Sequence, residues 1–211
     1  PFVKDEVEAY RSSRGSEAME ELPLNRVENQ GYIHYRKGSV VMYLLQYRLG
    51  EERVNAMLAE LLDRFKFKSQ PYASSTDLVD GFKALARDEA EARLVEDLLE
   101  NITLYDFTAS DATVAELENG QFETTFTVTA AKLYADGEGE ETEADFENLV
   151  DIGAFTKRPG YEALDPADVI SFRLEPLVSG EQVVTVTTDK KPAFVGWIRT
   201  ASSWTGRATT I

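Results

Sequence analysis

The chain has 211 residues, which is enough for one large domain or two small ones, and we expect two. It carries 38 acidic and 22 basic residues, a formal net charge of -16, which disfavours binding to nucleic acid and to anionic membrane surfaces because both are negatively charged. It has no cysteine, which excludes disulfides, thiol nucleophiles and thiolate metal ligands.

The sequence predicts neither a membrane segment nor a signal peptide. No run approaches the roughly 20 apolar residues that cross a bilayer, since the longest apolar-rich piece, residues 40–49, is interrupted by Gln46 and Arg48. We therefore expect a soluble chain without direct membrane contact. Because it starts at Pro1 without a cationic, apolar leader, we expect it to begin in the middle of a longer gene product.

Residues 1–101 have the three- and four-residue spacing of apolar side chains that is typical of helices. A polar connection follows the first helix, Gly50 ends the second, and Ser75 is expected to cap the fourth. Short connections between these segments predict a compact helical array. The predicted helices cover residues 2–14, 37–49, 51–65, a segment after Ser75, and a segment ending before Asn101.

From Ile102 the spacing changes from helical to alternating, and we place a domain boundary there. Residues 122–130 alternate apolar with polar side chains, and Asn119-Gly120 predicts a two-residue hairpin turn that pairs residues 112–117 with them. About seven short strands predict an antiparallel β-sandwich over residues 102–197. The other strands are expected at residues 149–155, 170–177, 182–188 and 193–197.

Several polar residues could carry chemistry. His34 is the one histidine, so two histidines on one helix face cannot occur, and nothing orders His34, Ser39 and Asp63 as a catalytic triad. We expect a structural role for His34. The acidic run over residues 136–147 lacks the spacing of a calcium loop and predicts a solvated, mobile loop.

The motif Tyr35-Arg36-Lys37-Gly38 opens the second predicted helix. Together with its neighbours it resembles the zinc aminopeptidases related to aminopeptidase N (gluzincins), in the bacterial branch that is often fused behind an ABC-transporter permease. The similar phrases are Glu21-Leu22-Pro23-Leu24, Val27-Glu28-Asn29-Gln30, Tyr32-Ile33-His34-Tyr35, Gly50-Glu51-Glu52-Arg53-Val54-Asn55 and Ile102-Thr103-Leu104-Tyr105-Asp106.

This resemblance implies a parent enzyme in which two histidines and a glutamate hold zinc and another glutamate is the general base. None of these four is in this chain, so we expect no metal or other cofactor in it and no activity from it alone. The resemblance assigns oxyanion stabilisation to Tyr35. Glu28, Lys37 and Gly38 are weaker candidates for residues near the substrate, and for Glu28 a solvated carboxylate on a polar loop is the default expectation.

The resemblance further implies that the helices are part of a thermolysin-like catalytic domain, whose partners are the rest of the peptidase chain and a peptide substrate. The parent would be bacterial and anchored in a membrane by the upstream permease. Without its missing half, the chain is expected to self-associate through exposed helix faces. Two alternatives stay open: a non-catalytic interaction module of a transporter-associated membrane protein, and an independent hydrolase that uses His34.

The tail, residues 198–211, is expected to be non-native or disordered. Family members follow the last strand with a phrase similar to Val-Asp-Pro-x-x-Lys-Leu-Val-Asp-Arg, which is missing here. Codons can be written for residues 196–206 that give such a phrase when read one base out of register, so we expect a frameshift. In that case Trp197 and the residues beyond it carry no function, and sequencing the coding DNA checks this.

Overall fold

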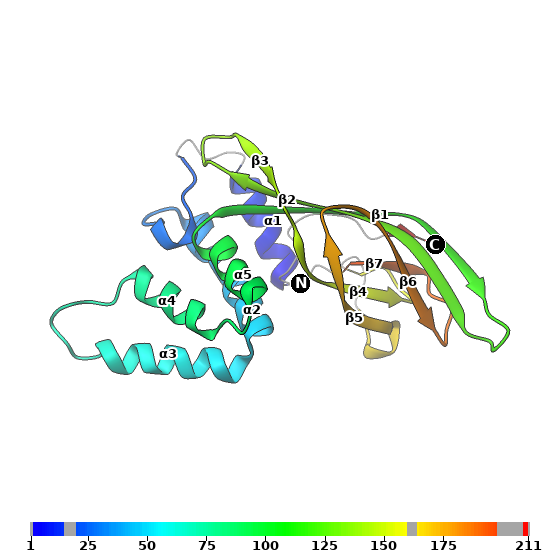
Figure 1. Ribbon diagram of the computed structural model, residues 1–211, viewed down its shortest axis with the longest axis horizontal. Helices are drawn as coiled ribbons and strands as arrows, with labels where there is room; N and C mark the ends of the chain where they lie inside the picture. The colour runs from blue at the N-terminus through cyan, green and yellow to red at the C-terminus, as the bar shows by residue number, and fades with distance from the viewer. Residues whose placement is uncertain (1, 15–19, 160–163, 198–208, 211) are drawn as a thin grey trace.

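A computed structural model describes residues 2–14, 20–159, 164–197 and 209–210 of the chain. The helices gather at one end of the molecule and the strands at the other (Figure 1). All strand pairs are antiparallel, so the expected mixture of helices and antiparallel sheets is confirmed. No helix in these ranges is both long and apolar enough to span a membrane.

The helices begin and end close to their predicted bounds. Gly50 has a φ of 96° and separates two helices that follow each other directly, as its place in the sequence predicts. The prediction that Ser75 caps the fourth helix is wrong, because Ser74 is the N-cap. The Ser74 hydroxyl accepts from the Asp77 N–H, and the Asp77 carboxylate accepts from the Ser74 N–H. The α-helices are α1 (Phe2–Arg14), α2 (Gly38–Leu49), α3 (Glu51–Phe65), α4 (Ser75–Leu85) and α5 (Glu89–Leu99).

The described residues between α1 and α2 contain two shorter helical elements. A 3-10 helix, η1, covers Leu24–Arg26, and a π-helix, η2, covers Tyr32–Lys37 and runs directly into α2. The predicted helix over residues 37–49 therefore has an additional, wider turn in front of it, which contains the candidate residue Tyr35.

The strands in the described part of the chain form two four-stranded sheets. In the first, β2 pairs with β1 along one edge, and with β6 and then β3 along the other; in the second, the order is β5-β4-β7-β8. Core residues of both sheets belong to one apolar cluster, as a sandwich requires. The strands are β1 (Ile102–Glu116), β2 (Phe122–Ala135), β3 (Glu141–Ala144), β4 (Glu147–Phe155), β5 (Val169–Val178), β6 (Gly180–Thr188), β7 (Phe194–Trp197) and β8 (Thr209–Thr210).

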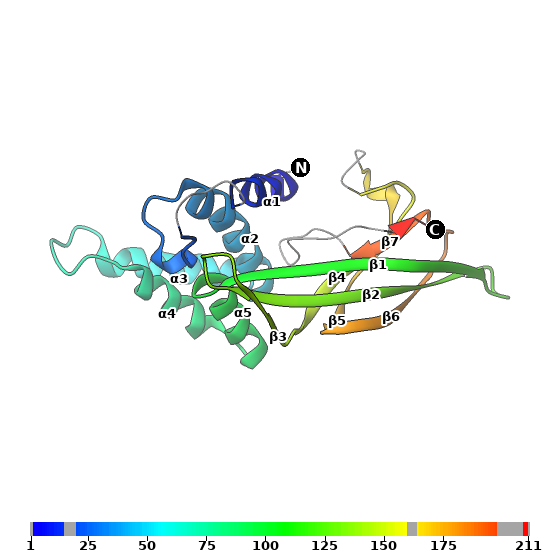
Figure 2. The same cartoon turned by 90° about the horizontal axis from the view of Figure 1, so that it is seen from above.

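The β1–β2 hairpin is longer than the short strands that the sequence predicts, and it extends from α5 to the far end of the molecule (Figure 2). Its register agrees with the predicted pairing, since Glu116 lies opposite Phe122. The prediction of a two-residue turn is wrong. Leu117 and Gln121 form the last backbone contact, and only Gly120 takes a positive φ, so that the loop contains three residues.

Most of the acidic run is solvated as predicted, but the run is not a loop over its whole length. Its first part is a turn in which the Asp136 carboxylate accepts from the backbone N–H groups of Glu138, Gly139 and Glu140 at 2.8, 3.1 and 3.1 Å. Its second part is β3, which pairs with the end of β2. The acidic composition indicated solvation, but the free edge of β2 offers backbone partners that composition alone does not reveal.

The helices and the sheets share a continuous hydrophobic core, and α5 leads into β1 at residues 99–102. A buried ion pair lies at this junction, where the Lys132 ammonium of β2 is 3.1 Å from the Asp97 carboxylate of α5. The Asp97 carboxylate also accepts from the Tyr134 hydroxyl. The expected boundary at Ile102 thus coincides with the first residue of β1, and polar as well as apolar contacts cross it.

Most of the tail that we expected to be non-native lies outside the described residues. Thr209 and Thr210 form β8, which pairs with β7. Trp197, which the frameshift hypothesis also assigns to the foreign sequence, is buried in β7 against Phe107, with ring centroids 5.8 Å apart.

Candidate functional site

The candidate site is built around the π-helix η2. The N–H groups of Ile33 and His34 both donate to the Gln30 carbonyl, at 3.0 and 3.2 Å, and the N–H of Gly38 donates to the Ile33 carbonyl five residues earlier. A hydrogen bond over five residues widens the turn relative to an α-helix. Such turns are rare and are found frequently at functional sites.

Tyr35 projects from the outer side of this turn. Its side chain is 72% exposed, and its ring lies 4.5 Å from that of His34, centroid to centroid. Its hydroxyl makes no hydrogen bond to any of the residues that the structure describes. A phenol held on a helix and left without an internal partner is available to donate to a bound ligand.

Tyr35 and His34 line a pocket of about 450 Å³, and Gly38 and Ser39 also belong to its lining. The lining is mainly apolar, and Met42 and Leu78 contribute to it. The volume is in the range of small-ligand sites. The full lining consists of Leu24, Asn25, His34, Tyr35, Gly38, Ser39, Met42, Ser75, Leu78, Val79 and Leu99.

Two of the residues expected near the substrate, Glu28 and Lys37, do not line this pocket. Glu28 is exposed on the connection before η2 and does not line the pocket. Lys37 is 1% exposed, and its ammonium lies 3.6 Å from the Glu21 carboxylate and 5.4 Å from the centroid of the Tyr10 ring. Burial opposes the charged form and lowers the pKa of Lys37, while Glu21 acts in the opposite direction. The structure therefore brings Tyr35 and Gly38 to one pocket, and directs Lys37 into the interior.

The residues of the hydrolase alternative are not arranged as a triad. His34 and Ser39 line the same pocket, but the Ser39 hydroxyl donates to the Arg36 carbonyl at 3.0 Å. Asp63 lies on α3, where it pairs with Lys66. Its carboxylate is therefore not in position to orient His34, which is what a serine hydrolase needs.

Zinc is the metal that the resemblance implies, and the residues at hand do not fit it. The chain has one histidine, and the described ranges contain no group of three or more potential ligands placed to hold a metal ion.

Sequence reasoning did not select Glu21 as a site residue, although Glu21 lies in one of the motifs that resemble the aminopeptidases. In the structure it is 4% exposed and contacts Tyr10, Arg14 and Lys37. A glutamate is expected to be exposed unless it is paired, and only the tertiary contacts reveal that Glu21 is buried.

Comparisons with known proteins identify no relative: no family model matches the chain, and no curated protein matches it.

Proposed function

We propose that the chain is the C-terminal part of a zinc-dependent metallo-aminopeptidase of the aminopeptidase N-like family, which hydrolyses the N-terminal peptide bond of its substrates. In this proposal residues 1–101 belong to a thermolysin-like catalytic domain and residues 102–197 to a β-sandwich that follows it. The rest of the catalytic domain supplies zinc and the general base, and an upstream permease anchors the parent in a bacterial membrane. The chain alone is inactive.

The observation that carries the proposal is the Tyr35 hydroxyl, which stands exposed on a π-helix beside an apolar pocket and has no hydrogen-bond partner in the described parts of the chain. When water adds to a peptide carbonyl, negative charge develops on the carbonyl oxygen. A phenol aimed at this oxygen donates a stronger hydrogen bond to the transition state than to the substrate, and so lowers the barrier.

The pocket supports the same assignment. A peptide whose scissile carbonyl faces Tyr35 would place one of the adjoining side chains within reach of residues such as Met42 and Leu78. Gly38 belongs to this wall, which gives the glycine of the motif a role at the surface of the pocket.

Replacing Tyr35 by Phe in the intact parent tests the proposal. Loss of one oxyanion donor raises the barrier by about 3 kcal/mol, so kcat is expected to fall about 100-fold while KM changes little. Tyr43→Phe is the matched control, because Tyr43 is also an exposed tyrosine, at 48%, but does not line the pocket. An active parent that is indifferent to Tyr35→Phe would contradict the role of the tyrosine.

The second candidate is a non-catalytic interaction module of a transporter-associated membrane protein. It is favoured by exposed apolar side chains at the end of the molecule formed by α3 and α4, among them Leu62 at 65%, Phe67 at 101% and Tyr72 at 71%. The DNA upstream distinguishes the two candidates. A His-Glu-x-x-His motif followed by a distal glutamate supports the peptidase, and its absence supports the module.

A further inference from the structure

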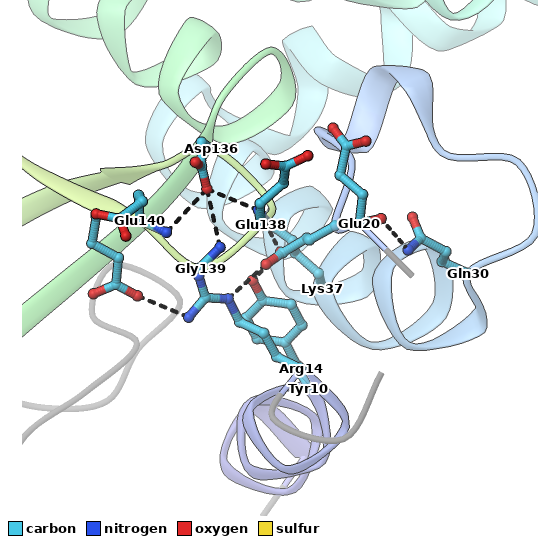
Figure 3. A network of polar contacts seen from close by, with 11 residues as sticks. Tyr10, Arg14, Glu20, Gln30, Lys37, Asp136, Glu138, Gly139 and Glu140 are labelled. Carbon is cyan, nitrogen blue, oxygen red and sulfur yellow. Dashed lines mark hydrogen bonds and ion pairs between the residues drawn. The ribbon is translucent and has the colours of Figure 1, made fainter. Parts of the chain in front are cut away.

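Figure 3 shows a network of polar contacts in which Tyr10 and Arg14 of α1 and Lys37 of η2 lie beside the β2–β3 turn. The contacts of the buried Glu21 join these three elements. Its carboxylate accepts from the Tyr10 hydroxyl and from the Arg14 guanidinium, at 2.6 Å for Nε, and pairs with the Lys37 ammonium. Burial, followed by the neighbouring carboxylate, raises the pKa of Tyr10, so the phenol keeps its proton and remains a donor.

Two contacts with residues 20–21 hold the two ends of the π-helix. At its start, the Gln30 side chain donates to the backbone carbonyl of Glu20 at 2.8 Å, and the Gln30 carbonyl accepts the first N–H groups of the turn. At its end, Lys37 pairs with Glu21. Tyr35 lies between these two points, so the position of residues 20–21 determines where the turn presents the phenol.

Residues 20–21 are in turn held by the sheet. The Glu21 N–H donates to the Gly137 carbonyl at 3.0 Å, and Arg14 reaches the Glu141 carboxylate of β3, also at 3.0 Å. The approach at Gly137 is close: its φ is +94°, and a Cβ there would lie 2.2 Å from the Glu21 carbonyl oxygen. The Asp136 carboxylate holds this turn by accepting three of its backbone N–H groups.

We propose that the β2–β3 turn fixes the position of the π-helix through Glu21, which makes Glu21 a positioning residue for Tyr35. The catalytic consequence depends on the function proposed above, whereas the mechanical link does not. In this proposal the strands contribute none of the residues that line the pocket, but they hold the π-helix that carries Tyr35 in position.

The turn offers a matched pair of substitutions. Gly137→Ala and Gly139→Ala both place a Cβ at a positive φ, +94° and +119°, so both strain the backbone of the turn. Only the first collides with Glu21, because nothing lies within 4 Å of a Cβ at Gly139. Amide hydrogen exchange of the 211-residue chain, resolved by residue, provides the measurement.

We expect Gly137→Ala to accelerate exchange at the Ile33 and His34 amides about tenfold, and Gly139→Ala to leave both within about twofold of the wild type. Exchange at Ile152 in β4 is the internal reference for global unfolding. The proposal is overturned if the two variants behave alike at the π-helix, or if the two amides change only in step with Ile152.

If Gly137→Ala does not fold, Gln30→Met provides a milder test. It removes one side-chain hydrogen bond to Glu20 and does not change the β2–β3 turn. It should also accelerate exchange at Ile33 and His34, and unchanged rates would contradict the proposal. In an active parent, Gly137→Ala should lower kcat with little change in KM, unlike Gly139→Ala. A parent that is insensitive to Tyr35→Phe but shows the exchange effect would retain the link and refute only the proposed function.

Discussion

Tyr35 and Lys37 are two positions apart on the same turn and have opposite surroundings. The wide π-helix turns the phenol of Tyr35 outward, at 72% exposure, and the ammonium of Lys37 inward, at 1%. An ammonium is buried only where it is paired, and Glu21 provides the opposite charge. The lysine of the motif therefore stabilises the turn from within, while the tyrosine remains available to a ligand.

Asp168 gives a prediction about pH. Its carboxylate accepts from the Thr156 hydroxyl at 2.6 Å, from the Lys157 ammonium at 2.9 Å and from the Asp165 N–H at 3.0 Å. These bonds, with Thr156 the largest cause, lower the pKa of Asp168 to about 2 from 3.8. The folded state thus binds the proton more weakly than the unfolded state, and the stabilisation is complete above pH 3.8 and is lost as the pH falls through about 2.

We therefore expect wild type and Asp168→Asn to differ in stability most above pH 4 and to converge towards pH 2, as measured by urea unfolding across this range. The comparison with the variant removes the contribution of the other acidic residues, which titrate in the same range. If the difference in stability between wild type and variant stays constant between pH 5 and pH 2, the negative charge of Asp168 does not stabilise the folded state.

Regular elements are the part of this fold that the sequence predicts well. The apolar spacing in residues 51–65 is long and uninterrupted, and α3 has the predicted bounds. The alternation that starts at Phe122 predicts the buried face of β2, and the structure extends the same face to a residue not included in the prediction, Lys132. In the sequence, the charge of Lys132 marks the end of the apolar pattern. In the structure Lys132 is buried together with its partner Asp97, so the buried face continues.

The elements that the sequence missed depend on contacts between distant residues. No side-chain pattern distinguishes a π-turn from an α-turn at residues 32–37, because the difference lies in which carbonyl each N–H reaches. Similarly, β3 exists because β2 presents a free edge to an acidic segment. The motif indicated Tyr35, but the pocket combines five helical elements and could not be assembled from one stretch of sequence.

The Asp97–Lys132 pair gives a prediction about the junction between α5 and the sheet. Both side chains are buried, at 4% and 3% exposure, and Tyr134 donates to the same carboxylate. Lys132→Met leaves the carboxylate buried without its cation, so we expect the free energy of unfolding to fall by about 3 to 5 kcal/mol. Urea unfolding followed by circular dichroism measures this change.

The double variant Asp97→Asn with Lys132→Met controls for packing, because it removes both charges and keeps the side-chain volumes similar. It should be more stable than Lys132→Met alone, since no unpaired charge remains at the junction. Equal stability of wild type and Lys132→Met would show that the ion pair contributes nothing to holding α5 on β2.

At the scale of the whole molecule, the helical end is incompletely covered. The apolar stripe of α3 packs on α4, but only Val54 of this helix is buried, and Leu62 remains 65% exposed. The connection that follows exposes Phe67 and Tyr72. Apolar side chains gathered at one end of a molecule in this way are typical of surfaces that another protein or domain covers.

A second copy of the chain can cover this surface when nothing else does, so we expect self-association that rises with concentration. Leu62→Lys should shift the equilibrium towards monomer, because it places a charge in the contact, as measured by light scattering and sedimentation velocity. Val183→Lys is the control, since Val183 is similarly exposed, at 69%, but lies on β6 at the other end. A wild-type chain that stays monomeric at high concentration contradicts the prediction, and a stronger effect of Val183→Lys would move the contact to the sheet.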